Sequence, residues 1–250
     1  MDQTTEAGIF TRRLGAPPRA GTPAMVLVHG LGLSGRYFLP LARRLAANGT
    51  TVLVPDLPGN ARSRAAARRA PGVGQLADAL AHWHQRLALG PSCLVANSVG
   101  CQVSAALAAR HPRLVSGMVL VGPALQPRTS GLRQFGRLLA DVPREPFSLL
   151  PLAATDYLLT GLARCAASFR GALRDAAESF EGNLARATAP TLVVRGAGDT
   201  IASRAWAAHV ARLAGEGRTA QIPGAAHAAH YSAPDALAAL IEEFAAGEPS

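Results

Sequence analysis

Lysine is absent from this chain of 250 residues, and its 25 basic residues are all arginine. Against 16 acidic residues they give a formal net charge of +9, which invites a nucleic-acid-binding interpretation. However, the densest basic stretch, residues 62–69, has no interleaved aromatic residues and matches no nucleic-acid-binding motif. Abundant alanine and arginine without lysine is instead typical of codon bias in a GC-rich genome. We therefore expect a solvated basic surface and no nucleic-acid partner.

Cysteines and long apolar runs are also scarce. The three cysteines, Cys93, Cys101 and Cys165, form an odd count without the spacing of a metal site. No uninterrupted apolar run reaches the roughly 20 residues of a membrane-spanning helix. Residues 1–10 begin acidic and lack the apolar segment of a signal peptide. These absences predict a cytoplasmic protein with reduced thiols and no membrane partner.

Short apolar runs alternate with amphipathic stretches along most of the chain, which is typical of the α/β class, with a mostly parallel central sheet flanked by helices. The apolar runs predict strands at residues 25–28, 51–54, 93–96, 115–121, 191–194 and 218–222. Helical spacing predicts helices over residues 35–47, 73–89, 99–110, 203–214 and 234–246. Residues 124–187 interrupt the alternation with prolines and helical segments. We expect them to form a helical cap on a core of residues 1–123 and 188–250.

Ser98 is the candidate nucleophile. It lies in the segment Ala96-Asn97-Ser98-Val99-Gly100, between an apolar strand and a predicted helix. Small residues on both sides are typical of the nucleophile elbow, a tight strand-to-helix turn. The same pattern surrounds Ser63, but no strand precedes that serine. A helix N-cap is the alternative role for Ser98.

A nucleophilic serine needs a base and a carboxylate that orients the base. His227 follows the last predicted strand, at the edge of the sheet where the Ser98 strand also ends. His230 is in the same loop, but no acidic residue accompanies this histidine pair as a metal site would require. Asp199 is the only carboxylate in the loop after residues 191–194, although an Asx turn or a helix cap would also account for it. Ser98, Asp199 and His227 therefore form the predicted catalytic triad.

Six segments in this order resemble the α/β-hydrolase superfamily, over residues 8–246. They are Leu27-Val28-His29-Gly30-Leu31-Gly32, Pro55-Asp56-Leu57-Pro58-Gly59, the turn at Ser98, Leu120-Val121-Gly122-Pro123, Gly196-Ala197-Gly198-Asp199 and Pro223-Gly224-Ala225-Ala226-His227. The resemblance implies that the backbone N–H groups of Leu31 and Val99 form an oxyanion hole. It also implies that residues 124–187 cover the site. Ala96, Asn60 and Ala226 stand where glycine is common in this family, but no catalytic group is missing.

These features together predict acyl transfer on a small hydrophobic substrate, without a metal or cofactor. Ser98 would attack a carbonyl group while His227 takes its proton and Asp199 orients His227. We expect the substrate pocket to include His29, Gly30, Asn97, Phe135, Leu139, Tyr157 and His230. Five arginines of the predicted cap would offer a site for a substrate carboxylate or phosphate: Arg128, Arg133, Arg137, Arg164 and Arg170.

Three hypotheses about function follow from the predicted triad. The first is a hydrolase of carboxylic esters. The second is a biosynthetic enzyme that redirects the triad, as a C–C hydrolase, acyltransferase, cyclase or eliminating enzyme. The third is a ligand-binding receptor that uses the pocket without chemistry. The sequence does not define the oligomeric state.

Overall fold

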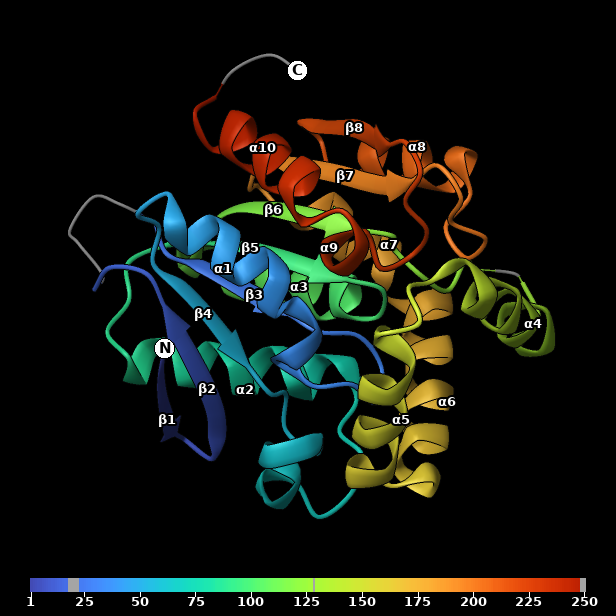
Figure 1. The fold of residues 1–250 in the computed structure, drawn as a ribbon, viewed down its shortest axis with the longest axis horizontal. Coiled ribbons are helices and arrows are strands. Elements are labelled where there is room, and N and C mark those ends of the chain that lie inside the picture. The colour runs from blue at the N-terminus through green and yellow to red at the C-terminus, as the bar shows by residue number, and fades with distance from the viewer. Residues whose placement is uncertain (18–22, 128, 248–250) are drawn as a thin grey trace.

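A twisted sheet forms the centre of the computed structural model, which describes residues 1–17, 23–127 and 129–247 (Figure 1). Within these residues the sheet has eight strands in the order β1-β2-β4-β3-β5-β6-β7-β8. The strands are β1 (Asp2–Glu6), β2 (Ile9–Leu14), β3 (Met25–Val28), β4 (Val52–Pro55), β5 (Ser92–Asn97), β6 (Val115–Val121), β7 (Thr191–Gly196) and β8 (Gly217–Ile222). Strands β3 to β8 are mutually parallel. Strand β2 runs antiparallel to both of its neighbours, β1 and β4. The predicted α/β class is confirmed.

Helices cover both faces of the sheet. They are α1 (Leu39–Ala47), α2 (Val73–Arg86), α3 (Gly100–Arg110), α4 (Gly131–Asp141), α5 (Leu149–Thr160), α6 (Leu162–Glu178), α7 (Phe180–Arg186), α8 (Arg204–Leu213), α9 (Ala229–Ser232) and α10 (Pro234–Ala245). Short 3₁₀ helices are η1 (Gly35–Phe38), η2 (Ala61–Ala66), η3 (Pro112–Leu114) and η4 (Val142–Arg144). Helices α1, α9 and α10 lie on one face, and α2, α3, α7 and α8 lie on the other (Figure 1).

The two faces of the sheet bury two separate hydrophobic cores, because successive side chains of a strand point in opposite directions. Along β5, Leu94 and Ala96 join the core beneath α2 and α3, whereas Cys93 and Val95 join the core beneath α1 and α10. Both faces are covered, so the strands contain nearly continuous apolar runs rather than alternating ones. This is why the inner strands β3 to β7 could be predicted from the sequence.

The N-terminal hairpin of β1 and β2 was not predicted. Strand β2 pairs with β4 at the edge of the sheet and contains two consecutive arginines, which obscure its buried positions. One of them, Arg12, is buried because its guanidinium forms an ion pair with Asp56 at 2.7 Å. A paired charge of this kind is tolerated in an interior position, where an unpaired one would be costly.

Helices α4 to α7 connect β6 to β7, within the stretch that the sequence predicts as a cap. Helices α4, α5 and α6 lie beyond the carboxyl ends of the central strands (Figure 1). We refer to these three helices and their connections, residues 124–178, as the insertion. Helix α7 packs against α3 and α8, with Phe180 and Leu184 in the core. In the described part of the chain, no helix combines the length and apolar character needed to cross a membrane.

Candidate active site

Ser98 lies in a tight turn between β5 and α3. Its φ angle is +59°, a left-handed conformation that is rare for a residue with a side chain. The Ser98 N–H donates a hydrogen bond to the carbonyl oxygen of Val121, which holds the turn against the end of β6. Helix α3 begins so close to β3 that a Cβ at Gly100 would lie 2.3 Å from the carbonyl oxygen of Val28. The backbone therefore presents the Ser98 side chain at the carboxyl edge of the sheet.

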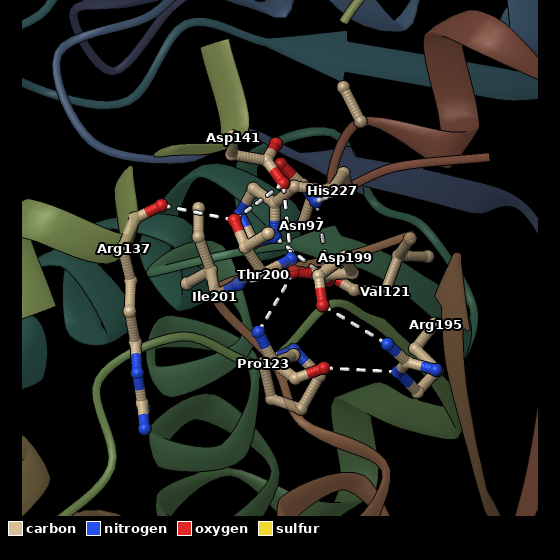
Figure 2. A network of polar contacts seen from close by, with 12 residues as sticks. Asn97, Val121, Pro123, Arg137, Asp141, Arg195, Asp199, Thr200, Ile201 and His227 are labelled. Carbon is tan, nitrogen blue, oxygen red and sulfur yellow. Dashed lines mark hydrogen bonds and ion pairs between the residues drawn. The ribbon is translucent and has the colours of Figure 1, made fainter. Parts of the chain in front are cut away.

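Asp199 and His227 follow β7 and β8 and are in direct contact. His227 Nδ1 lies 3.0 Å from Asp199 Oδ2, and both residues are buried (Figure 2). The other carboxylate oxygen of Asp199 accepts hydrogen bonds from the N–H groups of Ile201 and Ala202. Burial opposes both charges, but the mutual attraction and hydrogen bonding of the pair prevail. The pKa of Asp199 is consequently lowered, and the pKa of His227 is raised above its usual 6.5.

Arg195, in β7, holds the loop that carries Asp199. Its guanidinium donates to the carbonyl oxygens of Ala197, Asp199 and Ala202 over 3.0–3.2 Å (Figure 2). These bonds satisfy carbonyl groups that would otherwise be buried without partners. Arg195 was not identified from the sequence, although an arginine at the end of an apolar strand was a visible signal.

The side chain of Asn97 connects the loops around Ser98. Its Nδ2 donates to the carbonyl oxygens of Val121 and His227, at 3.1 Å each (Figure 2). Its Oδ1 accepts from the hydroxyl of Tyr37, which itself accepts from the N–H of Gly30 at 2.7 Å. Asn97 therefore links the histidine loop to the loop after β3. Tyr37 was not identified from the sequence.

Gly122 leaves the space that the aspartate and histidine occupy. Its φ angle is +56°, and a Cβ built there would lie 2.8 Å from His227 Nδ1 and 2.9 Å from Asp199 Oδ2. Any side chain at this position would enter the contact between the two residues. The end of β6 must therefore carry glycine for this geometry to form.

A cavity of about 540 Å³ opens over Ser98, between the sheet edge and the insertion. Ser98, Leu31, Val99 and His227 all line it. His227 Nε2 is buried without a hydrogen-bond partner in the described residues, so it is available to a group in the cavity. The N–H groups of Leu31 and Val99 likewise have no acceptor within the described part of the chain. The predicted base and oxyanion donors thus meet the predicted nucleophile in one space.

Most residues expected in the pocket line this cavity: Gly30, Asn97, Phe135, Leu139 and Tyr157. The structure differs for two histidines, His29 and His230. His29 lies behind the loop after β3, where it accepts from the N–H of Leu57 and contacts the carbonyl oxygen of Gly30. His230 is fully buried between the rings of Tyr37 and Phe38, with centroid distances of 4.2 Å. Burial lowers its pKa well below 6.5, so its ring is neutral.

Two carboxyl groups of the insertion, Asp141 and Glu145, contact the loops of the predicted triad. Glu145 Oε1 accepts from the N–H of Ala228, the residue after His227, at 2.6 Å. Asp141 Oδ1 accepts from the N–H and the hydroxyl of Thr200, the residue after Asp199 (Figure 2). Burial, reinforced by the neighbouring Asp141, raises the pKa of Glu145 to about 7. Neither carboxyl was identified from the sequence.

Helix α5 is bound to the loop after β3. The buried carboxylate of Asp156 accepts from the N–H and the hydroxyl of Ser34 and pairs with the guanidinium of Arg36. Four residues further along α5, the hydroxyl of Thr160 donates to the carbonyl oxygen of Gly32 at 3.0 Å. The loop that carries Leu31 is therefore held between the sheet and the insertion.

The cavity contains few charged side chains. Apart from the imidazole of His227, the lining includes two carboxyl groups, those of Asp141 and Glu145. The cap arginines Arg133, Arg137, Arg164 and Arg170 do not line it, and Arg128 is outside the described residues. Within the described residues, no group of three or more His, Cys, Asp and Glu side chains is arranged to hold a metal ion.

Comparison with known proteins agrees with this architecture. A family model of the alpha/beta hydrolase fold matches residues 23–146. A pimeloyl-[acyl-carrier protein] methyl ester esterase from Edwardsiella ictaluri is 31% identical over 255 residues, covering 91% of this chain and 95% of that protein. This chain belongs to the α/β-hydrolase family. The resemblance identified from the sequence is confirmed.

Other similar proteins place this α/β-hydrolase among relatives of its own length. The magnesium-chelatase 30 kDa subunit of Rhodobacter capsulatus is 28% identical over 254 residues, 91% of this chain and 88% of that protein. The crystal structure of an E-2-(acetamidomethylene)succinate hydrolase superposes with a TM-score of 0.79 at 23% identity and covers 97% of both chains. At that identity, the second match supports the fold alone.

Proposed function

We propose that this α/β-hydrolase is a serine esterase in which Ser98 is the nucleophile. The observation that carries the proposal is the cavity into which Ser98 and the free Nε2 of His227 both open, with Asp199 bound to the opposite ring nitrogen. Asp199 fixes the tautomer, since Nδ1 donates to its carboxylate and Nε2 is left as the acceptor. His227 then removes the Ser98 proton as the hydroxyl attacks the ester carbonyl.

The next step requires stabilisation of the negative charge that develops on the carbonyl oxygen. The N–H groups of Leu31 and Val99 supply it, because they line the same cavity and have no other acceptor among the described residues. Removing one donor of this kind typically costs about 10² to 10³ in rate. His227 returns its proton to the leaving alcohol, and water then hydrolyses the acyl-enzyme by the same route in reverse.

The lining of the cavity favours a neutral, apolar acyl group. Side chains from α4, α5 and α6 dominate it, among them Leu138, Leu149 and Phe169. With two carboxyl groups and no arginine among the described lining residues, the cavity opposes a negatively charged substrate. A dicarboxylate such as the acetamidomethylene succinate named for one relative is therefore disfavoured, whereas a methyl ester such as the one named for another is compatible.

A fluorophosphonate probe and p-nitrophenyl esters test the proposal. Wild-type protein should form a mass-detectable adduct on Ser98, and Ser98→Ala and His227→Ala should each lose about 10⁴-fold or more in kcat. Ser104→Ala is the matched control, because the Ser104 hydroxyl is buried in α3 without a hydrogen-bond partner in the described residues. It should retain both labelling and turnover.

Two substrates of equal length test the substrate class. The neutral p-nitrophenyl hexanoate should exceed the anionic mono-p-nitrophenyl adipate in kcat/KM by about tenfold or more, which corresponds to about 1.4 kcal/mol. Folded wild-type protein that is neither labelled nor active would refute the esterase proposal. Preference for the anionic ester would refute the assignment of the pocket.

A further inference from the structure

Exposed large apolar side chains are concentrated on the insertion. In the described residues, the only such side chain outside it is Met1. The others are Leu132, Phe135, Leu139, Val142, Phe147, Leu150, Leu158, Leu159 and Leu162. We call these nine residues the apolar face. The exposed fraction of the side chain reaches 86% for Phe147 and 83% for Leu132. Single apolar residues scattered over a surface need no explanation, but a concentration of them on one part of the molecule does.

The apolar face surrounds the opening of the Ser98 cavity. Five of its members are exposed and also line the cavity: Phe135, Leu139, Val142, Leu150 and Leu162. They come from α4, η4, α5 and α6, so every helical segment of the insertion contributes to the rim. The remaining four lie three or four residues along the chain from a rim residue. Five members of the apolar face therefore form the rim of the opening, and the other four are close to that rim in the sequence.

Most acidic side chains of the insertion are withdrawn from the surface, whereas most of its arginines are exposed. The insertion contains five acidic residues: Asp141, Glu145, Asp156, Asp175 and Glu178. Asp141, Glu145 and Asp156 bind the loops of the core. Of the five, only Glu178, at the end of α6, is exposed. The other exposed charged side chains of the described insertion are arginines: Arg133, Arg144, Arg170 and Arg174. The exposed charges of the described insertion are therefore predominantly positive, with four arginines against Glu178.

We propose that the apolar face docks on an anionic lipid surface, from which an apolar substrate passes directly into the cavity. Apolar side chains next to arginines suit the boundary between acyl chains and acidic headgroups. Docking of this kind requires no spanning helix. A second copy of the chain would instead bring arginines against arginines. A protein partner would cover the opening, whereas a bilayer would supply lipophilic ester to it. The passage of substrate rests on the proposed esterase function; the docking does not.

Sedimentation with vesicles tests the docking separately from catalysis, because it uses Ser98→Ala protein. We expect binding to vesicles of equimolar phosphatidylcholine and phosphatidylglycerol, with little binding to phosphatidylcholine alone and weaker binding at high salt. The double variant Phe147→Ser, Leu158→Ser should reduce the partition coefficient by about tenfold or more. These two side chains are highly exposed and do not line the cavity, so the fold should tolerate the change.

A charge variant and its matched control complete the test. Arg133→Gln, on the insertion, should weaken binding severalfold, whereas Arg113→Gln, an exposed arginine at the opposite edge of the sheet, should not. The proposal is overturned if acidic vesicles do not bind, or if the double variant binds them as well as its parent. It is also overturned if light scattering detects a dimer that the double variant dissociates. Turnover of a soluble ester without vesicles reports on the esterase function independently.

Discussion

Replacing Gly122 by alanine would insert a methyl group into the contact between His227 and Asp199. The added Cβ would lie 2.8 Å from His227 Nδ1 and 2.9 Å from Asp199 Oδ2, closer than carbon atoms approach such groups. One ring or loop must therefore move. A displacement of about 1 Å in a catalytic group costs about 10² in rate, and loss of the orienting carboxylate costs about 10⁴. We expect kcat/KM to fall within this range, or by about 3–5 kcal/mol.

The same substitution also introduces backbone strain, which must be separated from the collision. Gly122 has φ of +56°, and an alanine in this region costs about 1–2 kcal/mol of stability. Gly215→Ala is the matched control, because Gly215 has φ of +65° but no atom within 4 Å of the added Cβ. Urea denaturation should detect comparable strain in both variants, and p-nitrophenyl ester hydrolysis should be impaired only in Gly122→Ala. A folded Gly122→Ala protein with normal turnover would refute the proposed role of the pair.

Three further substitutions address the surroundings of the site. The proposed base His227 can accept a proton only when neutral, so kcat/KM should fall as the pH drops through its pKa, which is raised above 6.5. Glu145→Gln removes a negative charge that raises this pKa and should shift the acid limb to lower pH. An unshifted limb would count against this electrostatic coupling. Tyr37→Phe leaves the N–H of Gly30 without its acceptor. We expect kcat to fall with little change in KM, and the free energy of unfolding measured in urea to fall by about 1–3 kcal/mol. Asp156→Asn removes the charge that pairs with Arg36 in η1 and should lower stability by about 2 kcal/mol, measured by thermal unfolding; an unchanged midpoint would contradict it.

The arrangement of the sheet and the neighbourhood of the site could be predicted because both follow from strand order. Ser98 and Asp199 each follow an apolar run, His227 follows the edge strand β8, and the carboxyl ends of parallel strands meet at one edge. Knowing which loops meet requires only the sequence pattern of those runs. Whether the three side chains act together remains a prediction for the labelling experiment.

Other features depend on contacts that no local pattern encodes. Asp141 and Glu145 lie near the junction of α4 and η4, and nothing in their spacing indicates that they face Thr200 and Ala228 rather than solvent. A buried arginine such as Arg195 interrupts the apolar pattern of its strand, and only its acceptors account for it. The contacts of Asp141 and Glu145 join residues 59 and 83 positions apart, so the three-dimensional structure was needed to identify them.

The anchoring of the insertion has a consequence for selectivity. Its walls are fastened to the core by Asp141 and Glu145 at one side and by Asp156 and Thr160 at the other. Swinging these helices away from the sheet would break several buried hydrogen bonds at once and would disturb the loops next to Asp199 and His227. Substrate must then pass through an aperture of nearly constant width. The entrance would then select acyl groups by their cross-sectional width, before any bond to Ser98 is formed.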